Sequence, residues 1–171
     1  MRARRVLFCA TIVFTVLAAA RAHAAPGTSA DEILQLADRI AAQFEMAQYG
    51  AVWDGAAPMI RWAVDKAAFV RQLQATHKND GSVLDRGWAS IARIQYQNNR
   101  DIPDGLYANV DYAVHLKNGG VTYQLISLRL EEDGHWHFVG DARRQRANGI
   151  PTQPAIFLLS PDPSAERAPA R

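Results

Sequence analysis

The apolar residues of the N-terminal part of the chain recur with a helical period. In residues 28–48 they share one helix face, made of Ile33, Leu36, Ala37, Ile40 and Phe44. Ser29 and Glu32 have the spacing of a capping box, which predicts where this helix begins. The glycines and the proline of residues 49–62 predict a short helix followed by a turn.

A second long helix is predicted over residues 64–81. Asp65 stands at its N-cap position and Gly81 at its end. Its inward-facing residues are expected to be Phe69, Val70 and Leu73. The N-terminal part of the chain is therefore predicted to be helical throughout.

Beyond residue 86 the pattern changes to the alternation that is typical of strands. The alternating stretches are residues 87–97, 106–117, 121–132 and 135–144. Helices followed by a four-stranded antiparallel meander predict an α+β fold, with the helices packed on one face of the sheet.

The expected domain organisation follows from these patterns. We expect one domain over residues 31–146, preceded by a short segment, residues 25–30. The proline-rich tail, residues 147–171, is expected to be disordered. Its stretch "AIFLL" (155–159) is the exception and could dock on the sheet edge or in a groove.

The two hairpin turns decide which sheet face each apolar set occupies, because a slip of one residue exchanges the faces. Three-residue loops at residues 118–120 and 132–134 bring the large apolar sets to the helix-facing side. They pair Tyr112 with Ile126 and Leu128 with Phe138. The first strand is expected to send inward Trp88, Ser90, Ala92, Ile94 and Tyr96. The outer face then carries an unusually apolar set, Tyr107, Tyr123, Leu125, Ile91 and Val139.

His135 and His137 stand two residues apart, so a strand projects them from one face. In this register they lie on the outer face, opposite Glu131 and Arg129. A zinc or copper site needs three or four convergent ligands, and here only Glu131 is a plausible third. We therefore expect a solvated histidine pair, with no metal site and no cofactor.

Residues 1–24 have the pattern of a signal peptide, in which Arg2, Arg4 and Arg5 precede an apolar run that ends at "AHA". The run is shorter than a transmembrane helix, which needs about 20 residues. We expect export to the periplasm or the medium by the Sec route, although "RRVLF" leaves the twin-arginine route open.

Removal of the signal peptide changes the charge of the chain. Four of the 19 basic residues lie in residues 1–24, which leaves 15 basic against 17 acidic residues and a net charge of −2. A nucleic-acid binder needs a basic face, so no nucleic-acid partner is expected, and no membrane span is expected in the mature protein. The single cysteine, Cys9, lies in the signal, so no disulfide is expected either.

Several residues spread along the chain together resemble a known family. They are Tyr49, Trp62, Phe69, Leu73, Gly81, Arg86, "PDGLY" (103–107), Tyr112 and "DGHWHFVG" (133–140). Over residues 32–143 the sequence is similar to bacterial exported proteins of the domain of unknown function 4019 family. Two positions depart from its pattern: His77 stands where an arginine is usual, and Asp141 where an aromatic residue is usual.

The resemblance implies a fold rather than an activity. The family resembles the cystatin-like roll that nuclear transport factor two, ketosteroid isomerases and scytalone dehydratase also use. Enzymes with this roll place an Asp, a His or a pair of Tyr between helices and sheet, but the predicted register sends no strand aspartate or histidine there. The sequence also has no nucleophile motif and no phosphate-binding loop.

We therefore expect a non-catalytic protein, with two functional hypotheses. In the first, an interaction or envelope-associated module uses the outer sheet face to bind a protein partner or a second copy of itself. The alternative is a small-molecule binding module whose aromatic pocket is lined by Trp62, Tyr96, Tyr112, Gln124 and Trp136. An enzyme of the ketosteroid isomerase type ranks behind both.

Overall fold

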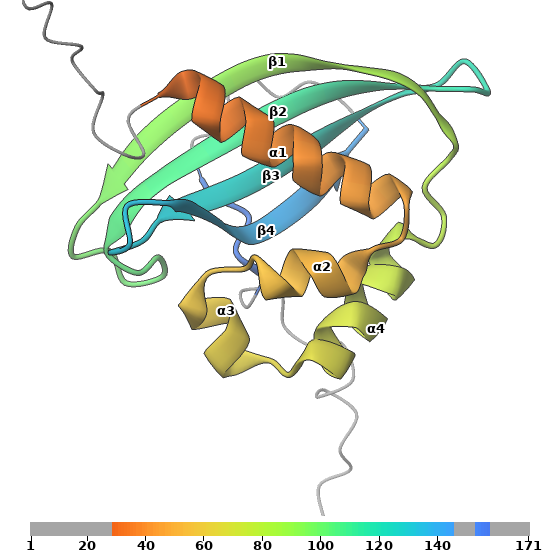
Figure 1. Cartoon of the computed structure of the whole chain (residues 1–171). Coiled ribbons are helices and arrows are strands. Elements are labelled where there is room, and N and C mark those ends of the chain that lie inside the picture. Colours follow the sequence, from red (N-terminus) through yellow and green to blue (C-terminus); the bar gives the residue numbers. More distant parts are fainter. Residues whose placement is uncertain (1–28, 146–152, 158–171) are drawn as a thin grey trace, which may run out of the picture.

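The computed structural model describes residues 29–145 and 153–157 (Figure 1). The predictions of a signal peptide and of most of the C-terminal tail fall on residues 1–28, 146–152 and 158–171, which lie outside the described residues. The helices are α1 (Ala30–Glu45), α2 (Tyr49–Asp54), α3 (Pro58–Ala63) and α4 (Lys66–His77). The strands are β1 (Val83–Tyr96), β2 (Gly105–Leu116), β3 (Val121–Leu130) and β4 (Trp136–Arg144). They form one antiparallel sheet in the order β1-β2-β3-β4.

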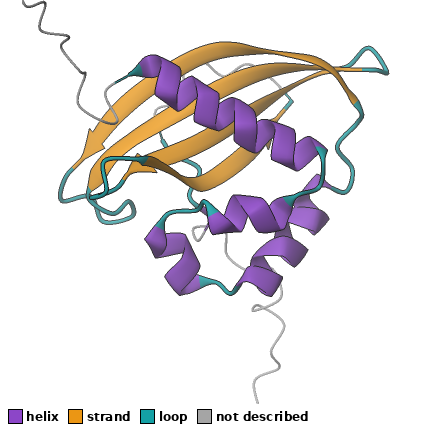
Figure 2. Ribbon diagram, viewed as in Figure 1, coloured by secondary structure: helices purple, strands orange, loops and turns teal. Residues whose placement is uncertain are grey.

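The layers are those of the predicted α+β roll. Figure 2 shows α1 lying across one face of the curved sheet, with the three shorter helices gathered near one edge. The core fills the space between helices and sheet, where Ile33, Phe69 and Phe138 are almost fully buried. None of the helices in the described ranges is long and apolar enough to cross a membrane.

Local capping explains where the long helices begin. The Ser29 hydroxyl accepts the Asp31 N–H at 3.2 Å, and the Asp65 carboxylate accepts the Ala68 N–H at 2.9 Å. Both caps were predicted. The segment between them holds two short helices instead of one, because Pro58 at the first turn of α3 starts a new helix.

The hairpin between β2 and β3 corrects the predicted pairing but not the predicted faces. The Leu116 N–H donates to the Gly120 carbonyl at 2.8 Å, so the three-residue loop spans residues 117–119, with Gly119 at φ 85°. Tyr112 therefore lies opposite Gln124 rather than Ile126. The pairing moves by two residues, which keeps every side chain of β3 on its expected face.

The hairpin between β3 and β4 has the predicted register. Leu130 pairs with Trp136 and Leu128 with Phe138, and Gly134 takes the left-handed position of the loop at φ 78°. Trp136 and Phe138 are 4% and 1% exposed, as expected for residues that carry the fold.

A bulge in β1 makes the prediction for that strand wrong. The pairing shifts between Trp88 and Ser90, which adds one residue and exchanges the faces beyond it. Ile91 consequently lies beside Val110 on the helix side. The inward placement expected for Ser90, Ala92, Ile94 and Tyr96 is incorrect, because these residues lie on the outer side.

Segments of the same chain cover much of the outer sheet face. Tyr107, Leu125 and Val139, expected to be available there, are at most 5% exposed. The Tyr107 hydroxyl donates to the Pro103 carbonyl in the loop before β2 at 2.9 Å. Residues 153–157 pack against another part of this face, where the Ala155 N–H donates to the Ser127 hydroxyl of β3 at 2.9 Å.

Candidate ligand pocket beside His77

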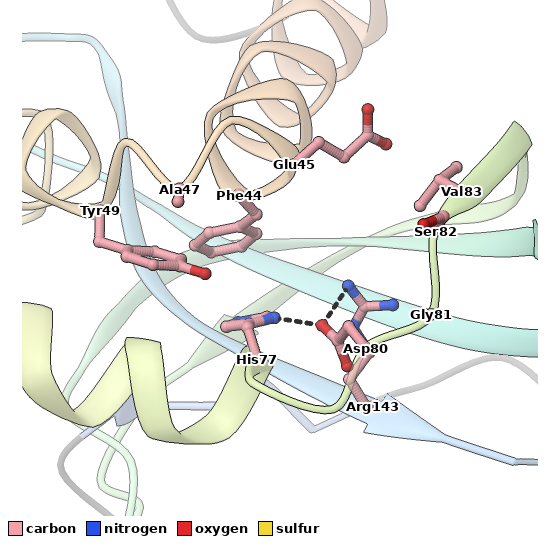
Figure 3. A pocket seen from close by; sticks show the side chains of 10 residues that line it. All are labelled: Phe44, Glu45, Ala47, Tyr49, His77, Asp80, Gly81, Ser82, Val83 and Arg143. Atoms are coloured by element: carbon pink, nitrogen blue, oxygen red, sulfur yellow. Dashed lines mark hydrogen bonds and ion pairs between the residues drawn. The ribbon is translucent and has the colours of Figure 1, made fainter.

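A cavity of about 390 Å³ opens where the ends of α1 and α4 meet the start of β1 and the end of β4 (Figure 3). Its lining combines aromatic, charged and small residues: Phe44, Glu45, Ala47, Tyr49, His77, Asp80, Gly81, Ser82, Val83 and Arg143. The volume falls in the range of about 300–1,000 Å³ typical of small-molecule sites.

Three rings form one wall of the cavity. The His77 imidazole stacks on Phe44 with ring centroids 4.7 Å apart and planes 26° apart. Tyr49 lies 5.8 Å from the imidazole at 22°. These residues come from α1, α2 and α4, so the wall exists only when the helices pack together.

A chain of charged groups continues from His77 along the cavity, and the dashed lines of Figure 3 show its contacts through Asp80 to Arg143. The Asp80 Oδ2 atom is 2.5 Å from His77 Nδ1 and 2.9 Å from Arg143 Nη2. On the other side of the imidazole, Asp141 Oδ2 is 3.2 Å from His77 Nε2. This last pair is an ion pair whose angle falls outside hydrogen-bond alignment. One buried imidazole thus lies between two carboxylates.

The two carboxylates set the charge of His77. Burial lowers the pKa of the imidazole, but its contacts with Asp141 and Asp80 outweigh burial and raise the pKa to about 9. His77 is consequently an imidazolium at neutral pH, although its side chain is only 3% exposed. Burial lowers the pKa of Arg143, against the charges of Asp80 and Asp141, which raise it.

A second polar group lies under α1, next to the cavity. Arg86 contacts Glu45 at 2.5 Å and lies 5.5 Å from the Tyr112 ring centroid. The Tyr112 hydroxyl donates to Asp38 at 2.7 Å, and burial followed by this contact raises the Tyr112 pKa. This network ties α1 to β1 and β2 beside the pocket, of which Glu45 is a lining residue.

Ala47 at the pocket rim has an unusual backbone conformation. Its φ is 53°, in the left-handed region that favours glycine. Non-glycine residues in this region carry a strain of about 1–2 kcal/mol and cluster at functional sites. Ala47 follows the end of α1, and its N–H donates to the Phe44 carbonyl at 3.0 Å.

The residues predicted to line an aromatic pocket do not come together in one cavity. Tyr112 and Gln124 face each other in the register and are buried on the helix side, and Trp136 is buried among the apolar core residues. Tyr96 lies on the outer side, edge-on to Tyr107 at 5.5 Å, because of the β1 bulge. Trp62 is 86% exposed on α3. The cavity beside His77 therefore has a different lining from the predicted one.

Of the two histidines expected on the outer face, His137 lies on β4, whereas His135 lies just before this strand and approaches α1. His137 pairs with Arg129 in the register, and its Nε2 atom is 2.9 Å from Asp133 Oδ2. His135 Nδ1 is 3.7 Å from Glu32 Oε1 of α1. Among residues 29–145 and 153–157, no group of three or more His, Cys, Asp or Glu side chains is arranged to hold a metal ion.

The sequence patterns did not indicate the residues that form the pocket. His77 lies in the second predicted helix and Asp141 in the last predicted strand, and neither pattern marks them as site residues. The one available signal was that both depart from the pattern of the resembled family. The structure brings these two departures into contact, 3.2 Å apart.

Comparisons with known proteins bear on the family and not on the pocket. The sequence model of the family described as "Protein of unknown function (DUF4019)" matches residues 29–141. A structure of a protein from Catenulispora acidiphila is similar, with a TM-score of 0.42 and 13% sequence identity, covering 67% of this chain and 88% of that chain. No curated protein matches the sequence significantly.

Proposed function

The chain belongs to the family described as "Protein of unknown function (DUF4019)", and we propose that it is an exported, non-catalytic protein that binds a small molecule. The proposed site is the cavity beside His77. The observation that carries the proposal is the combination of a ring wall, formed by Phe44 and Tyr49, with the charged wall of Asp80 and Arg143.

The chemistry of the walls favours a planar polar ligand. Phe44 and Tyr49 offer faces and edges for stacking, which stabilises a flat ring. The contacts of Asp80 with His77 and Arg143 both use Oδ2, so Oδ1 can accept a hydrogen bond from a ligand. Because positive and negative groups are balanced around the cavity, a neutral or zwitterionic molecule fits better than a strongly charged one.

A binding role agrees with the charge state of His77. A general base works best when its pKa lies near the operating pH and its nitrogen reaches the substrate. His77 has a pKa of about 9, and Asp80 and Asp141 occupy its two nitrogens. The imidazolium is therefore a fixed cation in the wall and a poor proton acceptor at pH 7.

The outer sheet face receives less support as an interaction surface. Self-association or partner binding through it would require uncovering Tyr107, Leu125 and Val139, which the chain itself buries. The chain itself already shields this apolar surface from water, so the surface does not need a partner to cover it. Ligand binding therefore becomes the better hypothesis, with the pocket residues revised.

NMR spectroscopy of the mature protein with a set of small planar heterocycles tests the proposal. We expect at least one class to shift the amide signals of Tyr49, His77 and Arg143 together. The variant Ser82→Trp, which places an indole at the cavity, should abolish these shifts, whereas Gln97→Trp at an exposed loop position should not. Shifts that persist in Ser82→Trp would show that the compounds bind elsewhere.

Export has its own test. We expect the protein recovered from outside the cytoplasm to begin at Ala25, as cleavage after Ala24 predicts. N-terminal sequencing of the fractionated protein reads this directly. An intact N-terminus confined to the cytoplasm would contradict the export part of the proposal.

A further inference from the structure

Residues 154–157 lie between β4 and α4, the two elements that supply Asp141 and His77. The Phe157 ring lies 4.5 Å from Phe69 of α4, tilted by 36°. On the strand side, the Ala155 carbonyl oxygen would be 1.8 Å from a Cβ atom at Gly140, so only glycine permits this approach. Ile156 between them is 5% exposed.

The docked segment has a specific hydrogen-bonding anchor on the sheet. The Ala155 N–H donates to the Ser127 hydroxyl at 2.9 Å, and this hydroxyl donates to the Asn109 side-chain oxygen at 2.9 Å. Ser127 and Asn109 are buried and lie opposite each other on β3 and β2. The segment is thus fastened by polar as well as apolar contacts.

Asp141 lies at the junction of the segment and the pocket. It follows Gly140 directly and lines a cavity of about 270 Å³ together with α4 and the segment. Its carboxylate is 4% exposed and contacts His77 Nε2 from the side away from Asp80. The distance between Asp141 and His77 depends on how closely β4 and α4 are held together.

We propose that the segment 154–157 is a clamp that holds β4 against α4, and that Asp141 is the positioning residue through which the clamp orients His77 in the pocket. Docking of the C-terminal segment and the electrostatic state of the pocket are therefore coupled. Release of the segment lets Asp141 move away from the imidazole and admits water to it. The inference builds on the pocket of the proposed function but does not require a ligand.

Other groups also face His77, and the nearest of them, Asp80, does not lie on β4 and so stays beside the imidazole when the segment is released. Asp80 precedes β1, Arg143 lies on β4, and Tyr49 faces the imidazole from α2. Glu45 of α1, paired with Arg86 of β1, lies farther along the wall. Loss of the Asp141 contact therefore lowers the His77 pKa without returning it to the value of a free histidine.

The test measures the His77 pKa by NMR in the full-length mature protein without ligand. In Gly140→Ala the new methyl group displaces Ala155, so we expect loss of hydrogen-exchange protection at the Ala155 amide and a fall of the His77 pKa by at least about one unit. Gly87→Ala on β1, where a Cβ has open space, is the matched control and should change neither. Asp141→Asn should lower the pKa while the segment stays docked.

A second variant covers the case in which Gly140→Ala does not fold. Ile156→Ser weakens docking from the segment side and leaves the sheet unaltered. The coupling would be overturned if Ala155 were released while the pKa of His77 stayed unchanged. It would also be overturned if the Ala155 amide stayed protected from hydrogen exchange in both variants. Because the readout needs no ligand, the coupling can fail while the pocket still binds a small molecule, and the reverse holds as well.

Discussion

Replacement of His77 tests the account of the charged wall most sharply. The folded-state pKa of about 9 lies above the ordinary value of 6.5, so protonation of His77 stabilises the folded protein. This stabilisation is fully present below pH 6.5 and is lost as the pH rises through 9. At about 1.4 kcal/mol for each pH unit, the difference corresponds to about 3 kcal/mol.

Urea unfolding followed by tryptophan fluorescence between pH 5.5 and 10 measures this effect. We expect the wild-type free energy of unfolding to fall by about 3 kcal/mol from pH 6.5 to above pH 9, and His77→Gln to lack that fall. His115→Gln is the matched control, because His115 also lies 2.5 Å from a carboxylate, that of Asp85, but is 50% exposed. This variant should keep the wild-type profile, because exposed pairs contribute little.

Two outcomes would refute the reasoning about His77. A wild-type profile that stays flat between pH 6.5 and 9 would mean that the imidazole is not held as a cation. An equal fall in His77→Gln would assign the pH dependence to other groups. Tyr49 does not interfere in this range, because burial raises its pKa above 10.

Four further substitutions test other parts of the structure. Ala47→Gly should raise the free energy of unfolding by about 1 kcal/mol, because glycine relieves the left-handed strain at φ 53°; urea unfolding measures it, and a loss of stability would contradict the assignment. Tyr112→Phe should cost about 1–3 kcal/mol by removing the hydroxyl bonded to Asp38, whereas Tyr123→Phe should cost much less in the same assay. Phe138→Ala should cost about 3–5 kcal/mol because its side chain is 1% exposed, and Trp62→Ala should be close to neutral in thermal melts. Asp111→Ala leaves the Arg144 side chain without the partner that it contacts, and a loss of about 3–5 kcal/mol is expected; a double-mutant cycle with Arg144→Ala separates the pair from its neighbours.

The features that the sequence predicted well are those that local rules determine. The caps at Ser29 and Asp65 form between residues a few positions apart. The faces of β2 and β3 follow from alternation and loop parity, so a pairing error of two residues left them unchanged, and β4 keeps its predicted face as far as Phe138, beyond which a bulge turns Asp141 and Arg143 to the helix side. The α+β architecture followed from the order of these elements.

The features that it missed depend on contacts between distant segments. The bulge between Trp88 and Ser90 has no local signature, and it exchanged the faces of β1 from Ser90 onward. The cover of the outer face comes partly from residues 153–157, which approach only once the sheet exists. The pocket arises because α4 carries His77 to Asp141 of β4, and no spacing rule links those two positions.

Native and denaturing mass spectrometry of the mature protein, purified gently from its own host, tests the central claim most directly. The proposal predicts one small molecule bound to the wild type and to Gln97→Trp under native conditions, released on denaturation, and absent from Ser82→Trp. A wild-type spectrum with no added mass under native conditions, or the same adduct on Ser82→Trp, would contradict the assignment of the His77 pocket as a ligand site.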